Sequence, residues 1–196
     1  MIVYIHGASA TAESFNYIRE HVKGPNIAIE YDSTNGFRDN LEEMKKVIQK
    51  YSNVIFVAHS LGGIYALHLA NTFPDRVKGA ITLSTPYGGA EVADYVKYFL
   101  PFSRLLRDIG PSSWPMNSLK KIKVQHPWTN VITTVGKSPW FNVPNDGVVT
   151  ISSMKHRDDM EHIEIDLNHY EVVISQTAVN IINSKIKEIK HESSME

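Results

Sequence analysis

The chain contains no cysteine among its 196 residues, and this absence excludes several kinds of chemistry. Disulfide bonds, thiolate nucleophiles and cysteine-ligated zinc sites cannot form without it. An excess of one charge is lacking too, because 20 Lys and Arg and 21 Asp and Glu leave a formal net charge of −1. We therefore expect neither nucleic acid nor an anionic membrane as a partner.

No signal peptide is expected from the sequence, and an uninterrupted membrane-spanning run is absent from it. The start, MIVYIHG, has no basic region and no small-residue cleavage site, so a cytoplasmic location is expected. Tyr51–Pro74 has no Asp, Glu, Lys or Arg and is about as long as a bilayer-spanning helix. Two histidines and the pair Gly62-Gly63 interrupt it, and its β-branched first part favours a strand, a turn and a helix instead.

The chain has instead an alternation of strand-like and helical patterns, in a length that suits one domain. Strands are predicted at Ile2–Ile5, Asn26–Tyr31, Val54–Ala58, Val77–Leu83, Val131–Val135 and His162–Leu167. Helices are predicted where apolar residues share a face, namely Phe15, Ile18 and Val22, then Leu41, Met44, Val47 and Ile48, and finally Ile174, Ala178, Ile182, Ile186 and Ile189. This alternation predicts an α/β fold with a mostly parallel sheet covered on both faces.

Residues 91–128 break the alternation. Large apolar side chains crowd together there, and Pro101, Gly110, Pro111 and Pro115 divide the segment into short pieces. A small helical cap packed over the edge of the sheet and ordinary core both fit this composition. We expect a cap insertion.

Ser60 is the first candidate for chemistry, in the stretch NVIFVAHSLGG at Asn53–Gly63. It follows a strand pattern, and ligands of parallel sheets bind beyond the carboxyl ends of the strands. A nucleophile on a tight strand-to-helix turn needs small neighbours, which Gly62, Gly63 and Ala58 supply. Ser60 is also the only serine of the chain followed at the second position by glycine. A serine that merely caps the next helix is the alternative, but such a cap needs no glycines after it.

A serine at such an elbow needs a histidine as base, placed after a later strand. His169 is the best placed of the nine histidines, because it follows the predicted strand His162–Leu167 and precedes the last helix. His156 and His162 are the alternatives. The surrounding stretch HRDDMEH lacks a ligand periodicity, so we interpret it as a solvated loop and expect no metal site.

The orienting acid should lie between the serine and the histidine in the chain. Asp146, in VPNDGVV, follows the predicted strand Val131–Val135 and belongs to the only Asp-Gly pair. A plain hairpin turn is the alternative interpretation, because such turns favour the same residues. Asp158, Asp159 and Asp166 are the reserve candidates.

An oxyanion hole would need two backbone N–H groups close to the serine. Leu61, directly after Ser60, is expected to supply one of them. The second is expected from Ala8, in the loop IHGAS after the first strand, where Gly7 lets the backbone turn close to the elbow. An ordinary glycine turn would explain the glycine but not its pairing with an elbow downstream.

The motifs VYIHGAS, VAHSLGG, LSTPYGGA and PNDGVV together resemble those of the α/β-hydrolase superfamily, and within it the small lipases and esterases. With the terminal histidine they span nearly the whole chain. The resemblance implies a minimal α/β-hydrolase fold of about six strands, since the chain opens directly on the HG strand. Tyr87 departs from the pattern, because lipases often have histidine in the TPYGG turn.

The resemblance also implies an activity. It implies carboxylic-ester hydrolysis through an acyl-serine, without a cofactor, in which Ser60 attacks, His169 moves the proton and Asp146 holds the imidazole. Phe99 and Phe102 of the cap would then form an acyl-binding wall that favours short to medium acyl chains over acetate. Thioesterase, amidase or peptidase, and acyltransferase reactions would use the same three residues. A non-catalytic binding module that keeps the pocket is the alternative of another class.

Overall fold

The computed structural model describes residues 1–88, 114–138 and 142–195, and in this part six strands form one sheet. The strand order is β2-β1-β3-β4-β5-β6, and every neighbouring pair is parallel. The strands are β1 (Ile2–Ile5), β2 (Asn26–Ile29), β3 (Val54–His59), β4 (Val77–Leu83), β5 (Trp128–Thr133) and β6 (Glu161–Ile165). The predicted fold class and number of strands are therefore confirmed.

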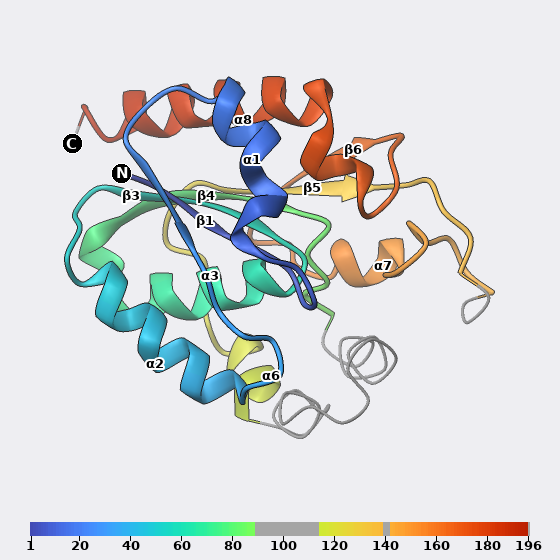
Figure 1. Ribbon diagram of the computed structural model, residues 1–196, viewed down its shortest axis with the longest axis horizontal. Coiled ribbons are helices and arrows are strands. Elements are labelled where there is room, and N and C mark those ends of the chain that lie inside the picture. Colours follow the sequence, from blue (N-terminus) through green and yellow to red (C-terminus); the bar gives the residue numbers. More distant parts are fainter. Residues whose placement is uncertain (89–113, 139–141, 196) are drawn as a thin grey trace.

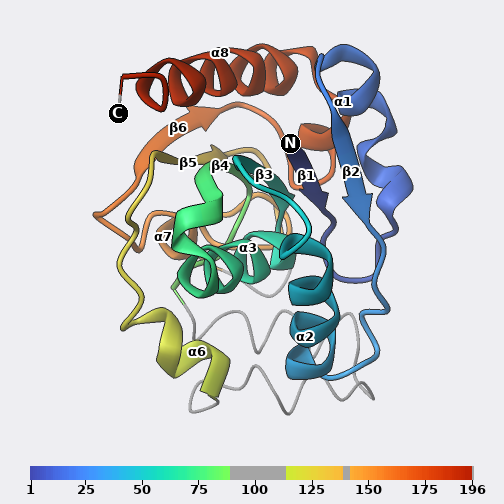
Figure 2. The same cartoon turned by 90° about the vertical axis from the view of Figure 1, so that its left-hand side faces the viewer.

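Helices cover both faces of the sheet (Figures 1 and 2). One face carries α1 (Asn16–His21) and α8 (Gln176–Glu192). The other face carries α2 (Phe37–Ile48), α3 (Leu61–Thr72), α6 (Trp114–Leu119) and α7 (Ile151–Met154). Short 3-10 turns are η1 (Ala12–Phe15), η2 (Pro74–Arg76) and η3 (Glu171–Ile174).

Each face of the sheet has its own hydrophobic core, because successive side chains of a strand point to opposite sides. Val3 and Phe56 pack toward α2 and α3, while Tyr4 and Val57 pack toward α1 and α8. Helix α3 lies between α2 and the sheet, and its residues are buried from Leu61 to Ala70. This explains why the stretch resembles a membrane span in composition. In the part of the chain that the structure describes, no helix is long and apolar enough to cross a membrane.

The fifth strand lies earlier in the chain than predicted. It covers Trp128–Thr133 rather than Val131–Val135, and Val135 is 48% exposed. The prediction was wrong because Thr129 and Asn130 interrupt the apolar run, although both are buried. Asn130 is satisfied by side-chain hydrogen bonds, accepting one from Thr82 and donating to two backbone carbonyls. Thr133 thereby lies at the carboxyl end of the strand.

Other boundaries also differ from the prediction: β3 extends to His59 rather than Ala58, and β6 begins at Glu161 rather than His162. Strand β2 ends at Ile29, because Tyr31 instead stacks on His6 with ring centroids 4.1 Å apart. Strand β6 ends at Ile165, before the predicted Leu167. Ile174 does not belong to the last helix: it lies in η3 and is 62% exposed.

Ser175 separates η3 from α8. Its hydroxyl accepts a hydrogen bond from the Thr177 N–H at 3.1 Å, as an N-cap residue does, and α8 begins at Gln176. The apolar residues predicted for this helix from Ala178 onward are buried.

The predicted cap insertion, residues 91–128, lies partly outside the described residues, and so do Phe99 and Phe102. Its described end contains α6 and stops before Trp128, which already belongs to β5. Helix α6 contacts the body of the protein through polar and apolar groups, among them buried Leu119. The Nε2–H of His68 in α3 donates to the Pro115 carbonyl at 3.3 Å, and the Arg38 guanidinium lies 4.9 Å from the centre of the Trp114 ring.

Candidate active site

Ser60 occupies the turn between β3 and α3, as the sequence predicts. Its backbone has φ 52° and ψ −122°, a conformation that costs free energy in a residue with a side chain. Two contacts hold it there. The Ser60 N–H donates to the Leu83 carbonyl of β4 at 2.9 Å, and the Thr85 hydroxyl donates to the Ser60 carbonyl at 3.1 Å.

The glycines after Ser60 are required by close packing. A Cβ atom on Gly62 would lie 2.2 Å from the carbonyl oxygen of Ile5 in β1, and one on Gly63 would lie 2.1 Å from the Thr85 hydroxyl. Without side chains at these positions, the first turn of α3 packs directly on the ends of the central strands. The tight elbow therefore follows from residue size, as expected from the sequence.

Asp146 and His169 lie side by side, both 0% exposed in their side chains, and are joined by a hydrogen bond from Nδ1–H to Oδ2 at 2.7 Å. A second bond runs between their backbones, from the His169 N–H to the Asp146 carbonyl at 3.1 Å. Asp146 lies in the loop after β5, and His169 follows β6. The structure thus brings together the predicted acid and histidine from segments 23 residues apart.

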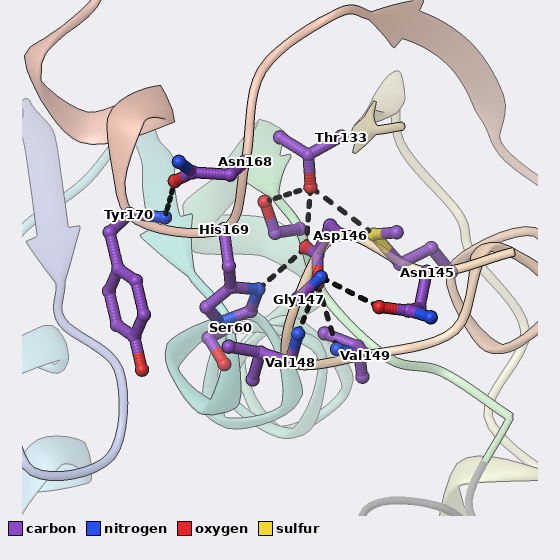
Figure 3. A network of polar contacts seen from close by, with 12 residues as sticks. Ser60, Thr133, Asn145, Asp146, Gly147, Val148, Val149, Asn168, His169 and Tyr170 are labelled. Carbon is purple, nitrogen blue, oxygen red and sulfur yellow. Dashed lines mark hydrogen bonds and ion pairs between the residues drawn. The ribbon is translucent and has the colours of Figure 1, made fainter. Parts of the chain in front are cut away.

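The Asp146 carboxylate is held on both oxygens (Figure 3). Oδ1 accepts from the N–H groups of Val148 and Val149 at 3.0 and 2.8 Å, and Oδ2 also accepts from the Thr133 hydroxyl at 2.6 Å. Burial alone would raise the pKa of Asp146, but the hydrogen bonds from His169, Thr133 and Val149 outweigh it and lower this pKa below the usual value. Asp146 is therefore ionised at neutral pH.

Asp146 also lies in a tight turn, as the alternative interpretation predicts. Its N–H donates to the Val149 carbonyl at 3.0 Å, and Gly147 has φ 98°, which favours glycine. This tight turn places the N–H groups of Val148 and Val149 on the carboxylate, so the turn and the acid are one structure.

The Ser60 hydroxyl is buried and makes no hydrogen bond with the described residues. Figure 3 shows the Ser60 side chain beside the imidazole of His169. Catalytic hydrogen bonds are often formed only in the substrate complex, so this arrangement suits a nucleophile before substrate binds.

His59, which precedes Ser60, connects the elbow to the histidine loop. Its Nε2–H donates to the His169 carbonyl at 2.9 Å, and the two ring centroids lie 4.8 Å apart. Burial and the neighbouring His169 lower the pKa of His59 to about 3, so its imidazole stays neutral over the physiological range. Sequence reasoning passed over this residue because it is too close to the elbow to serve as the base.

The loop after β1 carries Ala8, the second expected oxyanion donor, and lies against the elbow. A Cβ atom on Gly7 would be 3.1 Å from the Ser60 Cβ. The Ser9 N–H donates to the Ser33 hydroxyl, and the Ala12 N–H donates to the Glu30 carboxylate at 2.7 Å. The Ala8 N–H donates no hydrogen bond to a described residue. Leu61 is the first residue of α3, so its N–H has no acceptor within that helix.

The alternative residues lie elsewhere. His156 is exposed after α7, and His162 lies near the start of β6. Asp159 pairs with Arg157, while Asp166 accepts a hydrogen bond from Thr134. Asp158, next to Asp159 in the loop before β6, is exposed. Among the described residues, no group of three or more His, Asp or Glu could hold a metal ion.

Comparison with known proteins gives a family and a fold. A model of the Alpha/beta hydrolase family matches residues 2–142, which include the elbow but end before Asp146 and His169. Triacylglycerol lipase 2 of Saccharomyces cerevisiae is 26% identical over 164 aligned residues, covering 63% of this chain and 49% of the lipase. The chain thus spans about half the length of that relative.

Solved structures with a similar fold include both a lipase and a haloalkane dehalogenase. The mature form of lipase BlEst2 from Bacillus licheniformis has a TM-score of 0.72 at 16% identity, covering 92% of this chain and 89% of that one. A loop variant of haloalkane dehalogenase DbeA from Bradyrhizobium elkanii has a TM-score of 0.68 at 13% identity, covering 98% and 90%. Identities this low support a shared fold only, so the reaction must be inferred from the residues of the site.

Proposed function

Because the chain belongs to the alpha/beta hydrolase family, we propose that it cleaves carboxylic esters through an acyl-serine, with Ser60 as nucleophile, His169 as base and Asp146 as orienting acid. The observation that carries this proposal is the buried hydrogen bond between Asp146 and His169 beside a serine with positive φ. A plain helix cap would need neither the strained backbone nor the charged partner.

In the proposed acylation, the Ser60 Oγ attacks the ester carbonyl carbon while its proton passes to Nε2 of His169. The resulting imidazolium is stabilised by the ionised Asp146, which accepts the Nδ1–H. The negative charge on the former carbonyl oxygen is stabilised by the N–H groups of Leu61 and Ala8. When this intermediate collapses, the bond to the alcohol oxygen breaks, and His169 gives its proton to that oxygen.

Deacylation repeats these steps with water. The water oxygen attacks the acyl carbon, its proton passes to His169, and collapse returns this proton to Ser60 as the carboxylic acid leaves. Asp146 remains ionised throughout, since its two oxygens keep their hydrogen-bond donors.

The resemblance to small lipases supports the proposed substrate class, and two of the similar proteins are named as lipases. We propose esters with short to medium acyl chains, taken up by a wall that includes Phe99 and Phe102. A cytoplasmic location also stays a prediction from the sequence.

A panel of p-nitrophenyl esters with graded acyl chains tests the proposal. Wild-type protein should hydrolyse them, and Ser60→Ala should lose about a million-fold in kcat while it stays folded, because the triad acts as a unit. A Ser60→Ala protein that retains a tenth of the activity would exclude Ser60 as the nucleophile.

The same panel separates the rival reactions. Thioesters and anilides of the same acyl group are assayed beside the oxygen esters. A kcat/KM highest for the oxygen esters supports an esterase, whereas a higher value for thioesters or anilides would make the protein a thioesterase or an amidase. A protein that binds these esters without turnover would be a binding module.

A further inference from the structure

Tyr170 directly follows the proposed base and is unusual for its exposure. It is a large aromatic residue that is 56% exposed, and its ring meets the His169 imidazole edge to face, at 84° with centroids 5.5 Å apart. Figure 3 shows it on the side of the imidazole opposite Asp146. An exposed aromatic ring that touches a buried site needs an explanation.

The backbone around Tyr170 is fixed by local hydrogen bonds. The Asn168 side chain accepts from the N–H groups of Tyr170 and Glu171, each at 2.9 Å. The Glu171 carboxylate in return accepts from the Asn168 N–H at 3.0 Å. These reciprocal bonds resemble a capping box and fix the backbone that carries the ring.

Two other neighbours of the imidazole are buried. His59 lies 4.8 Å from it between ring centroids and is 6% exposed, and Asp146 binds Nδ1 and is 1% exposed. Of these three contacts on His169, Tyr170 alone reaches solvent. Among these three neighbours, the Tyr170 ring is therefore the surface that a group lying beside the imidazole and open to solvent would contact.

We propose that the Tyr170 ring forms a wall of the leaving-group subsite, against which the alcohol portion of the ester packs. The inference rests on the proposed function, because that mechanism fixes where the alcohol lies. Asp146 occupies Nδ1 of His169, so the leaving oxygen must receive its proton from Nε2. The alcohol thus departs beside the imidazole, and a flat aromatic wall there suits aryl or arylalkyl alcohols better than methanol.

The same subsite should receive an incoming alcohol during deacylation. There the alcohol oxygen attacks the acyl carbon in place of water, its proton passes through His169 to Ser60, and a new ester is released. The ratio of new ester to free acid then reports on binding of the alcohol. It does not depend on how fast the acyl-serine was formed.

The experiment uses butyrate esters, so that the acyl group stays constant while the alcohol changes from methanol to benzyl alcohol. In Tyr170→Ala, the ratio of kcat/KM for benzyl over methyl butyrate should fall about three- to ten-fold, the range expected for a lost aromatic contact. The ratio of benzyl butyrate to butyric acid, formed from p-nitrophenyl butyrate with added benzyl alcohol, should fall by a similar factor. Tyr170→Phe keeps the ring and should keep both ratios.

Tyr51→Ala is the matched control, because Tyr51 precedes β3 and lies at the end of the sheet opposite Ser60. It should leave both ratios at the wild-type value. Unchanged ratios in Tyr170→Ala, or an equal fall in Tyr170→Phe, would overturn the subsite. If mass spectrometry detects no butyryl-serine in the wild-type protein, the proposed function fails and the inference fails with it. A normal butyryl-serine with unchanged ratios overturns the inference alone.

Discussion

Ser60 reaches its position through the backbone, whereas Asp146 and His169 reach theirs through side-chain hydrogen bonds. The elbow, residues 58–63, depends on positive φ at Ser60 and on glycines that admit the ends of neighbouring strands. The acid–histidine pair depends on donors from Thr133 and from a turn, gathered on one carboxylate. Local residue size therefore determines one half of the site, and long-range polar contacts determine the other.

This comparison has a consequence for substitution. In the elbow, a methyl group added at Gly62 should disturb folding, because it meets the backbone of β1 and His6. In the acid–histidine pair, the loss of one donor or charge should disturb activity more than folding, because the remaining hydrogen bonds still satisfy the buried groups.

The largest of the following effects is expected at the acid. Asp146→Asn keeps the shape but removes the charge and allows the wrong tautomer of His169, so kcat should fall about ten-thousand-fold. The rate of ester hydrolysis measures the fall in kcat, and circular dichroism measures whether the variant keeps the fold. Asp159→Asn, at an exposed carboxylate, should stay near wild type. An Asp146→Asn protein within ten-fold of the wild-type rate would mean that another group orients the base.

Gly62→Ala should act on folding. Its new Cβ would lie 2.2 Å from the Ile5 carbonyl oxygen and 2.6 Å from that of His6, both backbone atoms. We expect a loss of about 3 kcal/mol in the free energy of unfolding. The three atoms nearest to a Cβ on Gly63 belong to the Thr85 side chain rather than to the backbone, so Gly63→Ala should cost less. Urea unfolding measures both variants. Equal losses in the free energy of unfolding would contradict the claim that a clash with backbone atoms costs more than one with a side chain.

Acid should weaken the fold through His59. Its pKa is about 3 in the folded protein and about 6.5 in the unfolded chain, so between these values the unfolded state binds more protons. The free energy of unfolding should fall as the pH drops from 6.5 toward 3, by about 2 kcal/mol at pH 5. Asp146, with its lowered pKa, adds a loss of the same sign below about pH 3.8.

Urea unfolding at pH 7.5 and pH 5 measures this loss. His59→Gln retains a donor for the His169 carbonyl but does not titrate, so it should lose less stability between the two pH values than wild type. His191→Gln, at an exposed site near the end of α8, should behave like wild type. The same pH dependence in His59→Gln and wild type would assign the acid sensitivity to other groups.

Thr133→Val should have the smallest effect. It removes the hydroxyl that donates to Asp146 Oδ2 while keeping the volume, so kcat should fall about ten-fold, as for one charged hydrogen bond. Thr134→Val removes the neighbouring hydroxyl, which binds the exposed Asp166, and is the matched control. A smaller loss at position 133 than at position 134 would contradict the hydrogen-bonded account of the acid.

The elbow could be predicted because its signals are local. A strand pattern, a serine and two glycines lie within 11 residues, and the structure has the strand and helix where these residues indicate them. Asp146 and His169 could be predicted from chain order, since each follows a later strand. That their side chains meet depends on loops whose conformation no local pattern specifies.

Thr133 and Tyr170 could not be predicted in the same way. Polar residues inside β5 shifted the expected strand, so Thr133 was placed in its middle rather than at its end. Tyr170 has no pattern of its own, and its role follows from the ring contact with His169. Phe99 and Phe102 stay predictions, since they lie outside the described residues.

Reaction with a fluorophosphonate, followed by peptide mapping in the mass spectrometer, tests the central claim most directly. A nucleophilic Ser60 should carry the phosphonyl group in wild type, with one adduct per chain, and Ser60→Ala should carry none under the same conditions. An adduct on any other residue of the wild-type protein, or equal labelling of folded Ser60→Ala, would contradict Ser60 as the nucleophile.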